Sequence, residues 1–504
     1  MESLKRHIAI FTTHPLFQRH FATELEIAQR HLNVGDTVTL LHCDGEMLAC
    51  ETNEEHTPAR CALCRQSRNI GVGSLHNTAN LHRRSFLNMT DADVQDLQTL
   101  TTTFTTMNDM MNYMSDNYDI GSSVLSSVVC SLKDSALDMT LHEDLLRRYM
   151  IASFTVFRSM RNFLRREKID TFYIFNGRMS MTRAILRACE AEGVEFYTHE
   201  CGNDAQTYST FHNAMPHGIQ MMTNLMLEHW NNAADNPQRN AIGAAWYENR
   251  ARGRKVNGYS FVEQQKAGLL PADRDPLKRH ISIFNTGSFE YVTVGDDYTN
   301  HLYPNQIEGL RRIIASLEPH KSELHLTIRI HPNLAGLPKE LDPVLAMQSD
   351  FVTVVPPTSP VSTYALIQHS EKVIVFNSTV GIEAVFFEKP SILAGKTAYQ
   401  DLGGNYTPQT HEELIKLALQ QDLQPKDKER ALIYGYFLNT FGIPFEFYKA
   451  DTFFGGAFNG RVPMANRWLF RLDTLYKRTA PASLQNAVTQ HFTEQMKRKI
   501  LHSA

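Results

Sequence analysis

The residues best suited to chemistry lie in a short polar segment, Asn377-Ser378-Thr379, between an apolar run and a run of helical character. A helix that begins directly after a strand offers free backbone N–H groups, and with the two hydroxyls these would suit an anion such as a phosphate. Gly381 would let a ligand approach the backbone closely, and Glu383 could accept hydrogen bonds from ribose hydroxyls. The alternative is a plain Ser/Thr helix cap followed by an acid in the first turn.

A second segment reads Arg329-Ile330-His331-Pro332 and follows an alternating apolar run. Pro332 would end the strand and fix the loop after it. A protonated His331 could neutralise charge on a departing phosphate. We assign Arg329, His331 and Pro332 to nucleotide binding, with the alternative that His331 is a strand-end histidine satisfied by a backbone carbonyl.

A third segment, in the first half of the chain, is Glu200-Cys201-Gly202, which follows another apolar run. A carboxylate at the carboxyl end of a strand is well placed to act as a general base. We therefore predict that Glu200 is catalytic together with His331. A solvated loop acid is the alternative for Glu200.

Three further residues of the first half follow predicted strands and are candidates for substrate binding. His14 follows the first strand, and Asn176 and Arg178 form a tight turn after a later one. Arg178 could meet an anionic donor or acceptor. A structural turn with a solvated arginine is the alternative.

Four cysteines lie close together near the N-terminus: Cys43, Cys50, Cys61 and Cys64. The last two have the Cys-x-x-Cys spacing that is typical of structural zinc sites. We predict a structural zinc here, remote from the chemistry, and no catalytic metal. Free thiols and a redox pair are the alternatives.

The elements that must position these residues follow from the apolar spacing. Helical patterns alternate with predicted strands at residues 7–11, 37–41, 171–175, 194–198, 280–284, 324–330, 352–355, 372–376 and 391–393. This alternation is typical of parallel α/β sheets, in which ligands bind at the carboxyl ends of the strands. Residues 90–168 predict a helical insertion, residues 203–230 predict helix, and the polar stretch 231–278 predicts a domain boundary.

We therefore expect an N-terminal domain over residues 1–270, a nucleotide-binding domain over 278–445 and a helical segment over 446–504. Val488, Phe492, Met496 and Ile500 recur every four residues in this last segment. We expect its final helix to pack back on the N-terminal domain. The alternative is a basic amphipathic helix that rests on an anionic membrane surface.

The bulk composition excludes several classes of protein. The formal net charge of −4 and the pI near 6.6 argue against a general nucleic-acid binder. Neither a signal peptide nor an apolar run long enough to span a membrane is found in the sequence. We expect a cytoplasmic protein, with peripheral contact at the inner membrane face as the alternative.

Together the three polar segments resemble those of the capsule polysaccharide biosynthesis transferases, which include bacterial Kdo transferases. They are similar, more distantly, to those of bacterial sialyltransferases. These enzymes carry an acidic motif ending in glycine, then His-Pro, then Ser-Ser or Ser-Thr. The matching residues, in order, are Glu200-Cys201-Gly202, His331-Pro332 and Ser378-Thr379, followed by Gly381 to Ala384, Lys389-Pro390, Gly395 and Tyr399. Cys201 departs from the pattern, because a second acid is common there.

The resemblance implies the α/β fold called GT-B, with two Rossmann-like domains facing across a cleft. It also implies inverting, metal-independent transfer from a nucleotide-activated sugar to a growing surface polysaccharide, with a glycan or lipid-linked glycan as the acceptor. Glu200 would deprotonate the acceptor, His331 would help the nucleotide leave, and Ser378 and Thr379 would hold its phosphate. A CMP-activated acid sugar such as Kdo is the favoured donor, and UDP-, GDP- and dTDP-sugars stay open. A CDP-polyol-phosphate transferase, a sugar-nucleotide epimerase and a non-catalytic assembly or export component are the alternatives.

Overall fold

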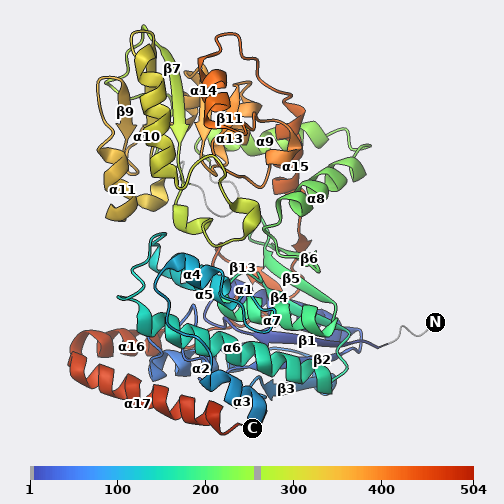
Figure 1. Cartoon of the computed structure of the whole chain (residues 1–504). Coiled ribbons are helices and arrows are strands. Elements are labelled where there is room, and N and C mark those ends of the chain that lie inside the picture. Colours follow the sequence, from blue (N-terminus) through green and yellow to red (C-terminus); the bar gives the residue numbers. More distant parts are fainter. Residues whose placement is uncertain (1–4, 255–260, 262, 504) are drawn as a thin grey trace. The chain divides into compact units, whose positions relative to one another are not determined.

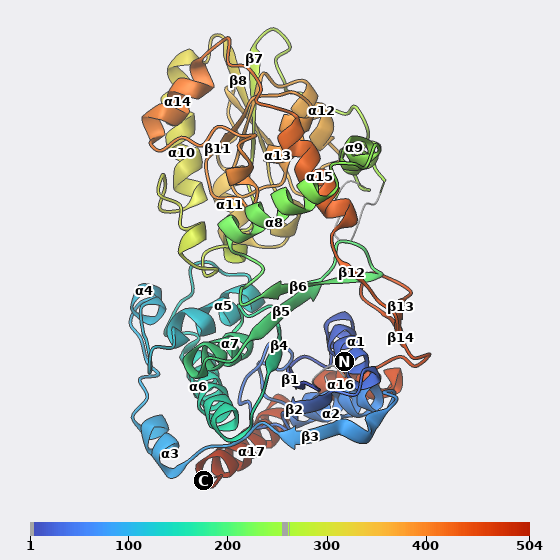
Figure 2. The ribbon, with the colours of Figure 1, turned by 90° about the vertical axis from the view of Figure 1, so that its right-hand side faces the viewer.

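The computed structural model describes residues 5–254, 261 and 263–503, and the chain folds into two compact units (Figures 1 and 2). The N-terminal unit comprises the described residues of 1–132, 136–216 and 442–504, and the C-terminal unit those of 133–135 and 217–441. The boundary expected near residue 270 therefore lies between Pro216 and His217. The cleft between the two halves stays a prediction.

A seven-stranded sheet forms the centre of the N-terminal unit, in the order β12-β6-β5-β4-β1-β2-β3. Its strands are β1 (His7–Thr12), β2 (Thr37–His42), β3 (Leu81–Ser85), β4 (Thr171–Phe175), β5 (Phe196–Cys201), β6 (Thr207–His212) and β12 (Ile443–Pro444). Strands β5, β4, β1, β2 and β3 are parallel, whereas β6 and β12 are antiparallel to their neighbours. The carboxyl ends of β1, β4 and β5 therefore lie at the same edge.

Nine helices of the described residues belong to the N-terminal unit. They are α1 (Gln18–Asn33), α2 (Pro58–Val72), α3 (Asp91–Gln98), α4 (Met107–Met111), α5 (Ile120–Leu132), α6 (Glu143–Arg166), α7 (Ser180–Glu192), α16 (Arg467–Thr479) and α17 (Ala482–Leu501). Helices α3 to α6 lie between β3 and β4 in the sequence, which confirms the predicted helical insertion. A short hairpin of β13 (Tyr448–Ala450) and β14 (Gly456–Phe458) packs against α1.

The C-terminal segment packs on the N-terminal unit. The ring of Phe492 lies 4.9 Å from that of His56, centroid to centroid. Nδ1 of the same histidine lies 2.8 Å from the Thr493 hydroxyl. Lys499 pairs with the buried Glu46. Helix α17 therefore covers the segment that carries the cysteines.

A five-stranded parallel sheet forms the centre of the C-terminal unit, in the order β11-β10-β7-β8-β9. Its strands are β7 (Arg279–Phe284), β8 (Leu324–Arg329), β9 (Val352–Val355), β10 (Lys372–Val375) and β11 (Ser391–Leu393). The chain moves from β7 to β8 and β9 on one side, and then to β10 and β11 on the other. The strand order thus reverses between β7 and β10, the position where ligands bind in open α/β sheets.

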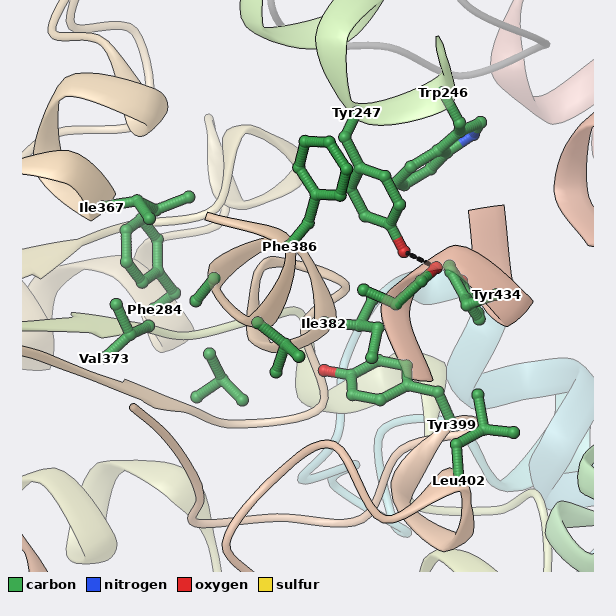
Figure 3. Packing of buried hydrophobic residues seen from close by; sticks show 14 of the residues in the cluster. Trp246, Tyr247, Phe284, Ile367, Val373, Ile382, Phe386, Tyr399, Leu402 and Tyr434 are labelled. Carbon is green, nitrogen blue, oxygen red and sulfur yellow. Dashed lines mark hydrogen bonds between the residues drawn. The ribbon is translucent and has the colours of Figure 1, made fainter. Parts of the chain in front are cut away.

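Eight α-helices of the described residues accompany this sheet: α8 (Ile219–Asn232), α9 (Arg239–Ala251), α10 (Gln306–Leu317), α11 (Pro338–Leu345), α12 (Thr363–Gln368), α13 (Val380–Phe386), α14 (His411–Leu419) and α15 (Glu429–Thr440). Figure 3 shows how α9 is fixed to this unit. Tyr247 stacks on Phe386 with ring centroids 4.4 Å apart, and its hydroxyl donates to the Ala431 carbonyl at 2.6 Å.

Two of the sequence-based expectations were wrong. Residues 207–212 form the strand β6 and not helix, and the polar stretch around 231–278 contains the helix α9. The strand β3 was not predicted, because its side chains are largely exposed and basic and carry no apolar pattern. Edge strands have fewer neighbours to pack against, so their apolar signal is weak.

Gly243 of α9 lets this helix touch α15 backbone to backbone. A Cβ atom at Gly243 would lie 2.5 Å from the Leu432 carbonyl oxygen. Gly243→Ala should therefore lower the free energy of unfolding by about 1–3 kcal/mol, the range for overpacked cores. Gly218→Ala is the matched control, since its added Cβ would meet Met221 at 3.5 Å, an ordinary contact. Equal melting temperatures for the two variants, measured by calorimetry, would contradict this packing.

Candidate functional site

A pocket lies in the C-terminal unit at the carboxyl ends of β7, β8 and β10. It encloses about 510 Å³ of space, part of it open to solvent. Its lining includes Arg250, Asn285, Arg329, His331, Pro332, Tyr364, Ser378, Thr379 and Glu383. The His-Pro and Ser-Thr segments, which lie far apart in the sequence, therefore meet in one pocket.

Arg329 supplies a buried positive charge to this pocket. Its guanidinium donates to the carbonyl oxygens of Pro356 at 3.2 Å and Ser359 at 3.1 Å. It forms no ion pair with any carboxylate of the described residues, and burial lowers its pKa to about 10. A desolvated cation without a counter-charge is costly, and a bound phosphate would supply that charge.

His331 is fixed by its backbone and by one ring nitrogen. Its N–H donates to Asn285 Oδ1 at 2.9 Å, and Nδ1 accepts the N–H of Asn333 at 3.1 Å. Burial and the nearby Arg329 charge lower the pKa of His331 to about 4. The expectation of a protonated His331 is therefore corrected for the free site. The neutral ring carries its proton on Nε2, because Nδ1 is an acceptor.

In the Asn-Ser-Thr segment, the asparagine lies outside the pocket, whereas the serine and the threonine line it. Asn377 adopts φ +52° and lies outside the pocket lining, with its carbonyl bound by the Tyr291 hydroxyl at 3.0 Å. Ser378 Oγ accepts the N–H of Val380 at 3.3 Å, which uses one donor of the expected anion site. Thr379 is exposed to the pocket. Of the three, Ser378 and Thr379 can meet a ligand there.

Gly381 has a different role from the predicted one. A Cβ atom at this position would collide with the Tyr399 hydroxyl and would lie 2.8 Å from a Val375 methyl. That hydroxyl donates to the Ser378 carbonyl. The glycine therefore makes room for a tyrosine that holds the Ser378 loop, and it is not part of the pocket lining.

Glu383 is a buried hub, only 1% exposed, and not a free ribose acceptor. Its Oε1 accepts from Arg250 at 3.2 Å and from Thr379 Oγ1 at 3.0 Å, and its Oε2 accepts from the Tyr364 hydroxyl. Both carboxylate oxygens thus accept hydrogen bonds from side chains of the protein. The carboxylate that was predicted to bind the nucleotide instead connects the residues that line the pocket.

Glu200 lies at the end of β5 in the N-terminal unit. Its Oε1 accepts a hydrogen bond from Asn176 Nδ2, and its Oε2 accepts the N–H of Cys201 at 3.1 Å. Burial raises the pKa of this carboxyl group, although the Asn176 hydrogen bond lowers it in part. Two residues predicted separately are therefore in direct contact. Asn176 orients Glu200 from the left-handed turn that follows β4.

His14 and Arg178 both lie buried beside this edge of the sheet. The Nε2 atom of His14 pairs with Glu51 at 3.0 Å. Arg178 donates from Nε to Ser126 at 2.8 Å and from a terminal nitrogen to Cys130 at 3.1 Å. Arg178 is not the solvated arginine of the alternative interpretation.

The structure does not gather the four N-terminal cysteines into a metal site. Among the described residues, no group of three or more potential ligands includes Cys43, Cys50, Cys61 or Cys64. The Cys50 thiol shares a hydrogen bond with the Thr52 hydroxyl, and the sulfur of Cys61 accepts a hydrogen bond from the Asn53 side chain. Burial raises the pKa of Cys61 to about 12 and raises that of the other three as well. This geometry favours free, protonated thiols over the predicted structural zinc.

Sequence reasoning missed Arg250, Tyr364 and Asn285, which complete the pocket. Arg250 lies in the stretch taken for a linker, although the spacing of Ile242 and Trp246 indicates a helix there. No local pattern could identify the other two, because their roles come from partners far away in the sequence.

Comparison with known families supports the resemblance for the C-terminal unit. A family model described as "Capsule polysaccharide biosynthesis protein" matches residues 244–440. The match begins in α9, which carries Arg250, and includes every strand of the five-stranded sheet. The resemblance inferred from the motifs is thereby confirmed for this stretch, which is less than half of the chain. No curated protein matched the chain by sequence.

Several solved structures show weak likeness. The beta Kdo 2,4 transferase KpsC of Thermosulfurimonas dismutans is 12% identical with a TM-score of 0.36, over 54% of this chain and 79% of that one. The S. aureus MnaA–UDP structure is 11% identical with a TM-score of 0.29, over 86% and 94%. UDP-GlcNAc 2-epimerase from Neisseria meningitidis, bound to UDP-GlcNAc, is 11% identical with the same TM-score, over 86% and 97%. With scores this low, none of them indicates a substrate.

The two buried arginines of the pocket should differ in their effect on stability. Arg250→Met would leave the Glu383 carboxylate without its counter-charge, and loss of one partner of a buried ion pair costs about 3–5 kcal/mol. Arg329→Met removes a charge that has no carboxylate partner, so its cost should be smaller by about 2 kcal/mol or more. Urea unfolding of both variants measures the difference. Equal losses would mean that Arg329 is as structural as Arg250.

Proposed function

We propose that this chain is an inverting glycosyltransferase that moves a sugar from a nucleotide-activated donor to a growing surface polysaccharide, without a catalytic metal. The observation that carries the proposal is the pocket that brings Arg329, His331, Ser378 and Thr379 together inside the stretch matched by the capsule family. A buried cation, an imidazole and hydroxyls are the groups that a leaving nucleotide needs.

The donor phosphate is proposed to bind beside Arg329, which supplies the missing counter-charge. The neutral His331 donates from Nε2–H to a phosphate oxygen, and the phosphate raises the pKa of the imidazole as negative charge develops. Ser378 adds a hydroxyl donor, whereas the hydroxyl of Thr379 donates to Glu383. Charge on the departing nucleotide is thus stabilised by groups that are already in place before the reaction.

Glu200 is proposed to accept the proton of the acceptor hydroxyl. Burial raises its pKa, which brings it closer to neutral pH and makes it a stronger base than an exposed carboxylate. Asn176 binds one carboxylate oxygen of Glu200 by a hydrogen bond. The other oxygen accepts the N–H of Cys201 and is proposed to accept the proton of the acceptor hydroxyl.

The donor is proposed to be a CMP-activated acid sugar such as CMP-Kdo, because the His-Pro and Ser-Thr motifs are shared with users of CMP-sugars. A sugar-nucleotide epimerase would need additional acids around the sugar. Among the described residues that line the pocket, Glu383 is the one carboxylate, and both of its oxygens are occupied. This observation favours transfer over epimerisation.

The acceptor is proposed to be a glycan or lipid-linked glycan reached at a membrane surface through α16. Trp468, Leu472 and Leu475 are 61%, 40% and 55% exposed and lie on one face of this helix, beside the exposed Arg471 and Arg478. The opposite face is occupied, because Leu469 and Phe470 pack near Leu63. None of the helices in the described part of the chain has the length and apolar character that crossing a bilayer requires. An apolar stripe flanked by arginines fits the surface of an anionic bilayer.

Two variants should lose sugar transfer while they keep nucleotide binding. A thermal-shift panel of CMP, CDP, UDP and GDP should give the largest stabilisation with CMP. Glu200→Ala and His331→Ala should reduce transfer by about 10²–10⁴-fold, the usual contribution of a general acid or base, while nucleotide binding stays measurable. His369→Ala, an exposed histidine of the C-terminal unit, is the control.

Each outcome of this experiment has a distinct meaning. Stabilisation by CDP alone would favour the polyol-phosphate transferase. Stabilisation by none of the four nucleotides would contradict the transferase proposal, and full activity in both variants would contradict the assignment of Glu200 and His331.

Membrane contact should depend on the exposed face of α16. The protein should co-sediment with vesicles that contain phosphatidylglycerol and not with pure phosphatidylcholine, because the arginines need an anionic partner. Leu472→Ser with Leu475→Ser should reduce the bound fraction several-fold. Leu277→Ser, at a leucine 94% exposed in the C-terminal unit, is the control. Equal binding by both variants would exclude α16 as the contact.

A further inference from the structure

Three side chains that could bind a metal converge at the carboxyl end of β5. They are His20 of α1 and the consecutive residues Glu200 and Cys201, and one ligand atom of each lies within 4.8 Å of the others. His20 Nδ1 and Cys201 Sγ are 3.5 Å apart. Among the described residues this is the one group of three or more histidine, cysteine and acidic side chains with that property.

The chemistry of the three side chains suits one class of cation. Imidazole nitrogen, thiolate sulfur and carboxylate oxygen are the ligands of Zn²⁺, and three protein ligands with water in the fourth position make an open tetrahedral site. Bonds of about 2.0–2.3 Å place neighbouring ligands roughly 3.3–3.8 Å apart. The spacing of His20 and Cys201 is already in this range, and a Glu200 oxygen lies within 4.8 Å of both ligand atoms.

The backbone around these residues is held by Arg19, the neighbour of His20. Its guanidinium donates to the carbonyl oxygens of Gly202 at 3.0 Å and Thr207 at 3.1 Å. The His20 ring lies against Phe175, with the ring centroids 4.0 Å apart. Arg19 therefore ties helix α1 to the segment that follows β5, and Phe175 of β4 supports the His20 ring. Ligands fixed in this way lose little conformational entropy on binding a metal.

We propose that His20, Glu200 and Cys201 form a binding site for a zinc-class divalent cation. Binding releases the thiol proton of Cys201 to solvent, and the thiolate, the imidazole and the carboxylate then donate one electron pair each to the ion. The site rests on its own geometry and not on the proposed transfer. A metal-bound Glu200 cannot accept a proton, so the ion would inhibit the proposed transfer rather than assist it.

Cobalt titration of the full-length protein, kept reduced with a phosphine, tests this site. Co²⁺ bound to a thiolate gives a charge-transfer absorption band in the near ultraviolet, and we expect this band to saturate at one ion per chain. Cys201→Ser should abolish the band. His20→Ala should weaken binding by at least the roughly 10-fold that loss of a supporting hydrogen bond costs at metal sites. Zn²⁺ should displace the cobalt and remove the band.

Cys61→Ser and Cys64→Ser are the matched controls, because they remove thiols of the same unit that the structure leaves outside the group. Both should keep the band. A band that persists in Cys201→Ser and disappears in these variants would place the metal among the N-terminal cysteines and overturn the proposal. Absence of a band in the wild-type protein would overturn it as well. Circular dichroism checks that each variant is folded.

Discussion

The buried carboxylate of Glu383 is the constraint on which the C-terminal unit depends. A buried charge costs much free energy unless it is paired and hydrogen-bonded, and this one is bound by Arg250, Tyr364 and Thr379. These residues come from α9, from α12 and from the start of α13. Satisfying one carboxylate therefore fixes three segments around the same point. The pocket is the space that these segments leave at the carboxyl edge of the sheet.

The two arginines of the pocket differ in whether a carboxylate neutralises their charge. Arg250 forms an ion pair with Glu383, whereas Arg329 donates only to carbonyl oxygens and keeps its full positive charge. Burial, together with this excess charge, lowers the pKa of His331 and keeps its ring neutral. The free pocket is thus a hydrogen-bond donor with one uncompensated cation, and this combination is complementary to a phosphate.

In the N-terminal unit, polar side chains gather at the carboxyl ends of the parallel strands β1, β4 and β5. Glu200 lies near the end of β5 and Asn176 directly follows the neighbouring strand β4, so the parallel arrangement brings them into contact. His20 reaches the same place from α1, and Cys201 occupies the position where related motifs often carry a second acid. A carboxylate suited to proton transfer and a thiol suited to a soft cation therefore lie side by side. Both possibilities follow from the carboxyl end of one strand, β5.

The sequence by itself determined all five strands of the C-terminal sheet and β1, β2, β4 and β5 of the N-terminal sheet, together with the strand ends at which chemistry was expected. Apolar runs located β1, β7, β8 and β10 closely, since buried parallel strands are apolar on both faces. Because the carboxyl ends of parallel strands share one edge, it also predicted that His331 and Ser378 belong together. These inferences depend only on local patterns and on a general rule of sheet geometry.

Tertiary structure alone decided which of these side chains are free. Arg250 and Glu383 are 133 residues apart, so no local pattern could show that the acid was already paired. The glycine at 381 accommodates Tyr399, and the clustered cysteines point to separate neighbours. His20 meets Cys201 across 181 residues. The physical reason is common to all of them. The local spacing of apolar residues indicates which face of a helix or strand is buried. The partner of a polar side chain depends instead on packing between elements that are distant in sequence.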